Sequence, residues 1–101
     1  MQNNKILNTL SMAQKAGKVV SGEFSCENAV KSEKVYLLVI AVDASDNTKK
    51  KMTNMASFYH VPICFFETKE HIGRCIGKEY RSMVAVLDRG FAESIQKKLT
   101  C

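Results

Sequence analysis

Residues 35–42 form an unbroken apolar and aromatic run that ends abruptly at Asp43. A run of this length, rich in Val, Leu and Ile, is typical of a strand that is buried on both faces of a sheet. Residues 45–47, Ser-Asp-Asn, then supply helix-capping side chains, and three lysines at 49–51 follow in a basic helix. Ligands of open α/β sheets usually bind beyond the carboxyl ends of the strands. The loop after residue 42 is therefore a candidate binding position.

Helical and strand patterns alternate along the rest of the chain. Ser21 and Thr68 are the predicted caps of the second and fourth helices. Strict alternation of this kind is typical of a three-layer α/β/α sandwich. We predict an α/β fold with a central mixed, mostly parallel sheet of about four strands, in a single domain over residues 1–101. The predicted helices are 3–16, 22–32, 47–59, 68–76 and a last one from Gly90, and the predicted strands are 18–20, 35–42, 63–66 and 83–87.

The overall composition limits the class of protein. The longest apolar run has only eight residues, far fewer than the roughly 20 of a membrane span. The N-terminus has no secretion-signal pattern, so we expect a cytoplasmic protein without a membrane partner. The formal net charge of +5 and the pI near 9.1 favour a polyanionic partner such as a nucleic acid. The same charge is also compatible with solvated surface lysines that bind nothing.

No catalytic or metal-binding motif is present in the sequence. The four cysteines form no Cys-x-x-Cys pair; we interpret Cys26, Cys64 and Cys75 as buried thiols and Cys101 as an exposed one. Asp43 and Asp46 are interpreted as caps of the following helix, because loop aspartates commonly have that role. Gly73 and Gly77 do not follow a strand as a phosphate loop requires, so they predict close packing in a short helix and its end. We expect no enzyme activity, no metal and no cofactor.

The basic residues are more informative. They occur near the ends of predicted elements, and we expect the loops at Gly22, Asp43 and Lys78 to converge at one end of the sheet. A helix that begins at Gly22 would present free backbone N–H groups to a phosphate there. Scattered solubility charges are the alternative explanation. The basic residues concerned are Lys15, Lys18, Lys31, Lys34, Lys49, Lys50, Lys51, Lys78 and Arg81.

The order of several segments resembles the ribosomal L-seven-Ae superfamily of kink-turn RNA-binding proteins, and its small bacterial YlxQ-type members most closely. The resemblance covers about Ile6 to Ile95, and its most specific parts are the strand followed by Asp43-Ala44 and the late Gly73-x-x-x-Gly77. It implies an α/β/α sandwich that binds structured RNA as a monomer without a cofactor. The segments that carry it are 19–22, 29–30, 37–45, 59–62 and 72–78.

The resemblance also implies which residues contact RNA. Family members commonly open their second helix with Gly-x-Asn-Glu-x-x-Lys, where this chain has Gly22, then Phe24, Ser25 and Asn28 at the three later motif positions. Ser25 and Asn28 retain hydrogen-bonding groups, and Phe24 is interpreted as a core or staple residue rather than a base-stacking one. The remaining predicted contacts are Asp43 after the long strand, Tyr80, Arg81 and Ser82 in a base-contacting loop, and Lys18, Lys31 and Lys34 on phosphates beside the Gly22 helix end.

These observations predict a non-enzymatic RNA-binding protein that recognises kink-turn-like RNA and is associated with the ribosome or translation, with ribosomal RNA as one candidate partner. Tyr80 is predicted either to stack on an extruded base or to anchor the loop before the last strand. The alternative function is a protein–protein interaction module on the same fold that has lost kink-turn binding, since one fold can carry several functions.

Overall fold

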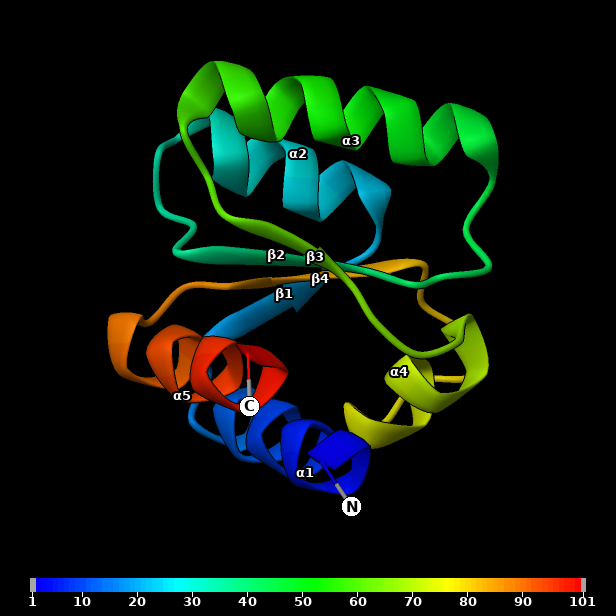
Figure 1. Ribbon diagram of the computed structural model, residues 1–101, viewed down its shortest axis with the longest axis vertical. Coiled ribbons are helices and arrows are strands. Elements are labelled where there is room, and N and C mark those ends of the chain that lie inside the picture. Colours follow the sequence, from blue (N-terminus) through cyan, green and yellow to red (C-terminus); the bar gives the residue numbers. More distant parts are fainter. Residues whose placement is uncertain (1, 101) are drawn as a thin grey trace.

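The computed structural model of the protein describes residues 2–100 and alternates helices with strands throughout (Figure 1). The predicted element order is therefore confirmed, with small changes at the boundaries. The prediction for Cys101 lies outside the described residues. The elements are α1 (Gln2–Lys15), β1 (Val19–Ser21), α2 (Glu23–Lys31), β2 (Leu37–Ile40), α3 (Asp46–Tyr59), β3 (Ile63–Phe65), α4 (Lys69–Cys75), β4 (Met83–Val86) and α5 (Arg89–Thr100).

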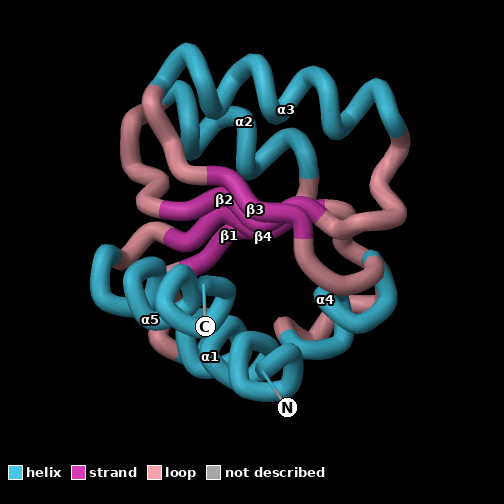
Figure 2. The backbone as a smooth tube through the Cα atoms, viewed as in Figure 1, coloured by secondary structure: helices cyan, strands magenta, loops and turns pink. Residues whose placement is uncertain are grey.

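The helices form two layers on either side of a four-stranded sheet, which confirms the α/β/α sandwich. Helices α2 and α3 cover one face, and α1, α4 and α5 cover the other (Figures 1 and 2). The strands lie in the order β1-β4-β2-β3. Within residues 2–100 no helix combines the length and apolar character that a membrane crossing requires.

The sheet is mixed as predicted, but the expectation that it is mostly parallel is wrong. Only β2 and β3 pair in parallel; β4 lies between β1 and β2 and is antiparallel to both. A parallel connection needs a crossover long enough to return along the sheet. Helix α4 has seven residues and spans only about 10 Å. The chain therefore enters β4 at the end where β3 finished and runs back.

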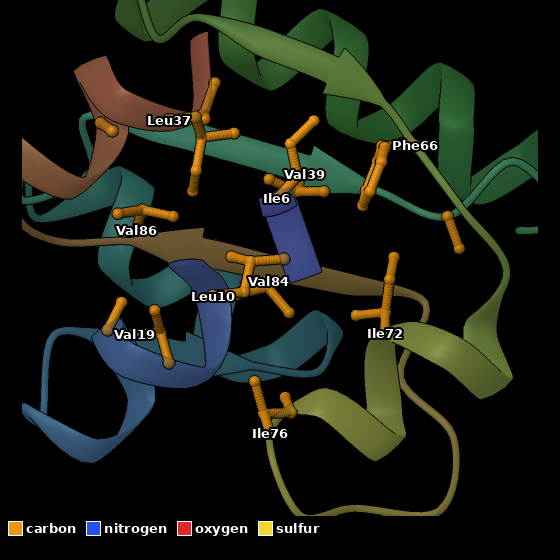
Figure 3. Packing of buried hydrophobic residues seen from close by; sticks show 14 residues of the cluster. Ile6, Leu10, Val19, Leu37, Val39, Phe66, Ile72, Ile76, Val84 and Val86 are labelled. Carbon is orange, nitrogen blue, oxygen red and sulfur yellow. The ribbon is translucent and has the colours of Figure 1, made fainter. Parts of the chain in front are cut away.

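The buried core lies on both faces of β2. All four of its residues are buried, and so are the four residues of β4. Side chains alternate along β2: Leu37 and Val39 join the cluster under α1, α4 and α5, which also contains Ile6 (Figure 3). Leu38 and Ile40 join the second cluster, with Met52 of α3. The strand is shorter than the predicted 35–42, because the apolar run continues into loops at both ends.

Three cysteines contribute to these clusters as free thiols. Cys26 is buried, as predicted, whereas Cys64 and Cys75 are half-buried. Burial raises the pKa of Cys26 to about 12 and the pKa values of Cys64 and Cys75 to about 11. All three thiols are therefore protonated at neutral pH, which makes them poor nucleophiles.

Candidate nucleic-acid interface

Four loops converge at the end of the sheet where β2 finishes and β4 begins, on the right of Figure 1. The backbone N–H of Gly22 donates to the carbonyl of Met83 at 3.2 Å, and the N–H of Ala41 donates to Ser82 at 2.8 Å. The N–H of Arg81 donates to Lys69 at 3.1 Å. We call residues 21–25, 41–45, 66–69 and 78–82 the loop face. The predicted convergence of the loops at Gly22, Asp43 and Lys78 is confirmed.

The first turn of α2 lies at this face without a side-chain cap. Its N-cap residue is Gly22, with φ 89° and ψ 154°, and no side-chain hydrogen bond caps the helix. The prediction that Ser21 caps it is wrong: Ser21 ends β1, and its Oγ accepts a hydrogen bond from Arg81 Nε at 3.0 Å. The N-terminal N–H groups of a helix lack intrahelical partners, so they are available to an anionic ligand.

Three side chains of α2 that the sequence singled out are exposed. Ser25 and Asn28 lie three residues apart and therefore share one side of the helix. Phe24 is 79% exposed, so its interpretation as a core residue is wrong. The buried residues Cys26 and Val30 mark the core side of α2. Phe24 lies two positions before Cys26 and therefore points away from the core side of the helix. The spacing of these two residues in the sequence could have predicted the exposure of Phe24.

The backbone of the loop between α4 and β4 packs closely against α4. A Cβ atom built on Gly73 would lie 2.8 Å from the carbonyl oxygen of Glu79 and 2.9 Å from the Cα atom of Tyr80. The N–H of Lys78 donates to Gly73 at 2.8 Å, and Gly77 adopts φ 78° just after the helix. The predicted packing and helix-ending roles of the two glycines are confirmed.

This loop presents one aromatic ring and one partly fixed cation. Tyr80 is 56% exposed, which leaves its ring accessible to a ligand. Arg81 is half-buried; besides its bond to Ser21, its NH1 group donates to the Tyr80 carbonyl at 2.8 Å. Ser82 is half-buried, and its carbonyl accepts a hydrogen bond from the N–H of Ala41, the residue after β2. Arg81 therefore joins the β1–α2 turn to the loop before β4.

Asp43 has a different structural role from the one predicted. Ser45 is the N-cap of α3 and accepts a hydrogen bond from the N–H of Thr48 at 3.1 Å. Asp43 Oδ1 instead accepts from the N–H of Lys69, the first residue of α4, at 2.9 Å. It therefore fixes the β2–α3 loop to α4. Val42, beside it, is 48% exposed, a feature that the apolar run in the sequence concealed.

Lys18, Lys31 and Lys34 do not lie beside Gly22. Lys18 precedes β1, and its carbonyl accepts a hydrogen bond from Leu87 at 2.7 Å, at the far end of β4 from Met83. Helix α2 runs away from the loop face, so its last residue, Lys31, and the following Lys34 also lie at that far end. The predicted cationic rim around Gly22 is therefore wrong. A phosphate-binding role for these lysines stays a prediction.

The loop face carries no excess of positive charge, since its cations Lys69, Lys78 and Arg81 are matched by Glu23, Asp43, Glu67 and Glu79. Lys51 of α3 donates to Glu27 at 2.9 Å and to Glu23 at 3.2 Å. The hydrogen bonds to Glu27 and then Glu23 raise the pKa of Lys51. Arg74 pairs with Glu70 in α4. Binding at this face must therefore depend on local donors and aromatic rings more than on a strong positive field.

His, Cys, Asp and Glu are the side chains that could hold a metal ion in this protein. Within residues 2–100 no group of three or more of them is arranged to hold a metal ion. His71 Nδ1 lies 2.9 Å from Glu67 Oε1, one helical turn away, and both belong to the surroundings of α4. This contact joins a side chain before the helix to one in its first turn.

Comparisons with known proteins agree with the fold and the motifs. The model of the ribosomal protein L7Ae/L30e/S12e/Gadd45 family matches residues 4–96. The chain is 42% identical to the RNA-binding protein YlxQ of Bacillus subtilis (strain 168) over 86 residues. This aligned stretch covers 85% of this chain and 86% of the relative.

Two solved structures have the same fold. A protein with unknown function from Bacillus halodurans C superposes with a TM-score of 0.92 at 30% identity, over 96% of this chain and 98% of the other. The Giardia lamblia 15.5kD RNA binding protein superposes with a TM-score of 0.82 at 20% identity, over 98% and 88%. The second likeness concerns the fold alone. Because the family model matches residues 4–96, which is most of the chain, the chain belongs to the ribosomal protein L7Ae/L30e/S12e/Gadd45 family.

Proposed function

We propose that this protein is a non-enzymatic RNA-binding protein that recognises a sharply bent, kink-turn-like RNA through its loop face. We propose further that it acts as a monomer in the cytoplasm, in association with the ribosome or translation. One observation carries the proposal: the uncapped first turn of α2 lies directly beside the loop that holds Tyr80, and Arg81 links the two. The name of the Bacillus subtilis relative supports RNA as the ligand class.

The chemistry of the face suits a distorted RNA better than a regular duplex. Ser25 and Asn28 offer hydrogen-bonding groups to base edges, and the free N–H groups of α2 offer a phosphate site. Exposed rings at Phe24 and Tyr80 suit unstacked bases, which a bent RNA extrudes and a straight helix does not. Asp43 contributes by positioning, since it holds the β2–α3 loop on α4.

The test compares two RNAs of equal length, a kink-turn and a straight duplex, in a gel-shift or anisotropy titration. We expect tighter binding to the kink-turn at every salt concentration, because base and shape contacts are less salt-dependent than phosphate contacts. Both affinities should fall with salt, by roughly one logarithmic slope unit per phosphate contact. Equal and weak binding to both RNAs would reject the proposal and leave only general charge attraction.

The protein–protein alternative is favoured by one specific observation. Phe24, Val42 and Tyr80 expose 79%, 48% and 56% of their surfaces on the same loop face. Exposed aromatic and aliphatic side chains are also typical of protein docking surfaces. A partner retained on the wild-type protein after nuclease treatment, and lost with Phe24→Ser, would support this alternative.

A further inference from the structure

A second charged surface lies at the end of the molecule opposite the loop face, on the left of Figure 1. Here β1 and β2 begin, β4 ends, and α1 and α2 finish. The N–H of Leu87 donates to Lys18 at 2.7 Å, and the N–H of Tyr36 donates to Val86 at 2.9 Å. These hydrogen bonds bring together segments that are distant in the sequence. We call the surface the basic end; its cations are Lys15, Lys18, Lys31, Lys34 and Arg89.

The positive charge of this end is not neutralised by ion pairs. All five cations are exposed, and within residues 2–100 none of them has an acidic side chain within ion-pair distance. The acidic residues within one helical turn of these cations are Glu27, Glu33, Asp88 and Glu93. Glu27 pairs with Lys51, and Asp88 Oδ2 accepts a hydrogen bond from the N–H of Phe91 at 2.9 Å. The situation contrasts with Lys51, which is paired twice.

Helix electrostatics explains only part of this arrangement. Lys15 and Lys31 lie in the last turns of α1 and α2, where a cation interacts favourably with the helix dipole. Lys18 and Lys34 lie outside the helices. Arg89 is the first residue of α5, the helix end at which the dipole disfavours a cation. A residue that opposes its local preference suggests a functional constraint.

An aromatic ring lies among these cations. Tyr36 is 44% exposed, and the guanidinium carbon of Arg89 lies 5.8 Å from the centre of its ring, in the range of a cation–π contact. Cations interspersed with an aromatic ring suit nucleic acid, because the cations contact phosphates and the ring offers a stacking surface. An anionic membrane would use the cations but not a stacking surface.

We propose that the basic end binds the phosphate backbone of a second RNA segment while the loop face holds the first. The protein would then bridge two parts of a folded RNA across the horizontal axis of Figure 1, along which the molecule extends 26 Å. The inference relies on the proposed function only for the identity of the polyanion. Its own test uses a straight duplex, so that it does not depend on recognition of a kink-turn.

The test compares two variants that lose the same number of charges. Lys18→Gln/Lys31→Gln/Lys34→Gln removes three of the five cations of the basic end, and Lys5→Gln/Lys49→Gln/Lys50→Gln removes three lysines of α1 and α3 that lie outside the basic end. Affinity for the duplex is measured from low to high salt. We expect the first variant to bind roughly 10- to 100-fold more weakly near 0.15 M salt, with a slope lower by two to three units, and the control to change less than about three-fold.

Equal losses in the two triple variants would overturn the proposal, since only total charge would then matter. An unchanged duplex affinity, combined with loss of binding to phosphatidylserine vesicles, would overturn it in favour of a membrane. Thermal melting checks that each variant folds, and Lys34→Gln alone, expected to lower the slope by about one unit, gives a milder second test. If the wild type shows no kink-turn preference but the basic-end effect remains, only the proposed function of the loop face fails.

Discussion

Replacing Gly73 with alanine is expected to destabilise the protein and weaken RNA binding at the same time. The added methyl group would lie 2.8 Å from the Glu79 carbonyl oxygen and 2.9 Å from the Tyr80 Cα atom, and both are backbone atoms. Two hydrogen bonds tie this loop to α4, from Lys78 to Gly73 and from Arg81 to Lys69. The loop therefore has little freedom to move aside. Overpacking of this kind typically costs about 1–3 kcal/mol of unfolding free energy.

The binding effect of Gly73→Ala follows from what the displaced loop carries. Tyr80 and Arg81 would leave their positions beside the first turn of α2, so we expect affinity for the kink-turn to fall at least about ten-fold, the equivalent of one lost charge-assisted hydrogen bond. Denaturant unfolding and an RNA titration measure the two effects. Gly90→Ala is the matched control, because its Cβ would meet one side-chain atom, Asp88 Oδ2, at 3.2 Å, and not the backbone. A small shift of that carboxylate relieves the contact, at the expense of some of its hydrogen bond from the N–H of Phe91. Equal stability of the two variants would contradict this account of the loop.

Restoring the family's second-helix pattern is expected to strengthen kink-turn binding. The variant Phe24→Asn/Ser25→Glu/Asn28→Lys recreates Gly-x-Asn-Glu-x-x-Lys from Gly22 onward. It adds one acid and one base, so the net charge of +5 does not change. The three side chains are exposed, and the fold should tolerate their replacement. Each charged hydrogen bond gained is worth about 1.5–3 kcal/mol, so we expect at least a ten-fold gain in affinity.

The straight duplex provides the control for this gain. Because the net charge is constant, affinity for the duplex should change little, and the gain should appear as a larger ratio between the two RNAs. Lysine at position 28 alone, as Asn28→Lys, should strengthen binding to both RNAs slightly through charge. An unchanged ratio for the triple variant would mean that α2 does not approach the RNA through Ser25 and Asn28.

Much of the fold was predictable because local signals agreed with the tertiary structure. The apolar run at 35–42 predicted the buried central strand, Thr68 predicted the start of α4, and Gly77 predicted its end. The direction of β4 was not predictable from alternation alone. It depends on whether α4 is long enough to return along the sheet, and a seven-residue helix is too short.

The candidate site was only partly predictable for a related reason. Gly22 and Lys18 are close in sequence, but an extended chain covers about 13 Å over four residues, enough to separate the two ends of a three-residue strand. Helix α2 then carries Lys31 a further ~13 Å from Gly22 over nine residues. Sequence proximity grouped the lysines with the glycine, whereas the strand and the helix separated them. The role of Arg81 as a link to Ser21, 60 residues away, leaves no local signal in the sequence.

Amide hydrogen exchange of the protein with and without a minimal kink-turn RNA tests the central claim most directly. The account predicts slower exchange in two separate segments, Glu23 to Ser25 in the first turn of α2 and Glu79 to Tyr80 in the loop before β4, because RNA would cover amides at the surface of the loop face. The amides of Gly22, Lys78 and Arg81 already donate hydrogen bonds within the fold and serve as internal references. Protection confined to β3 and α5, with both loop-face segments unchanged, would contradict it.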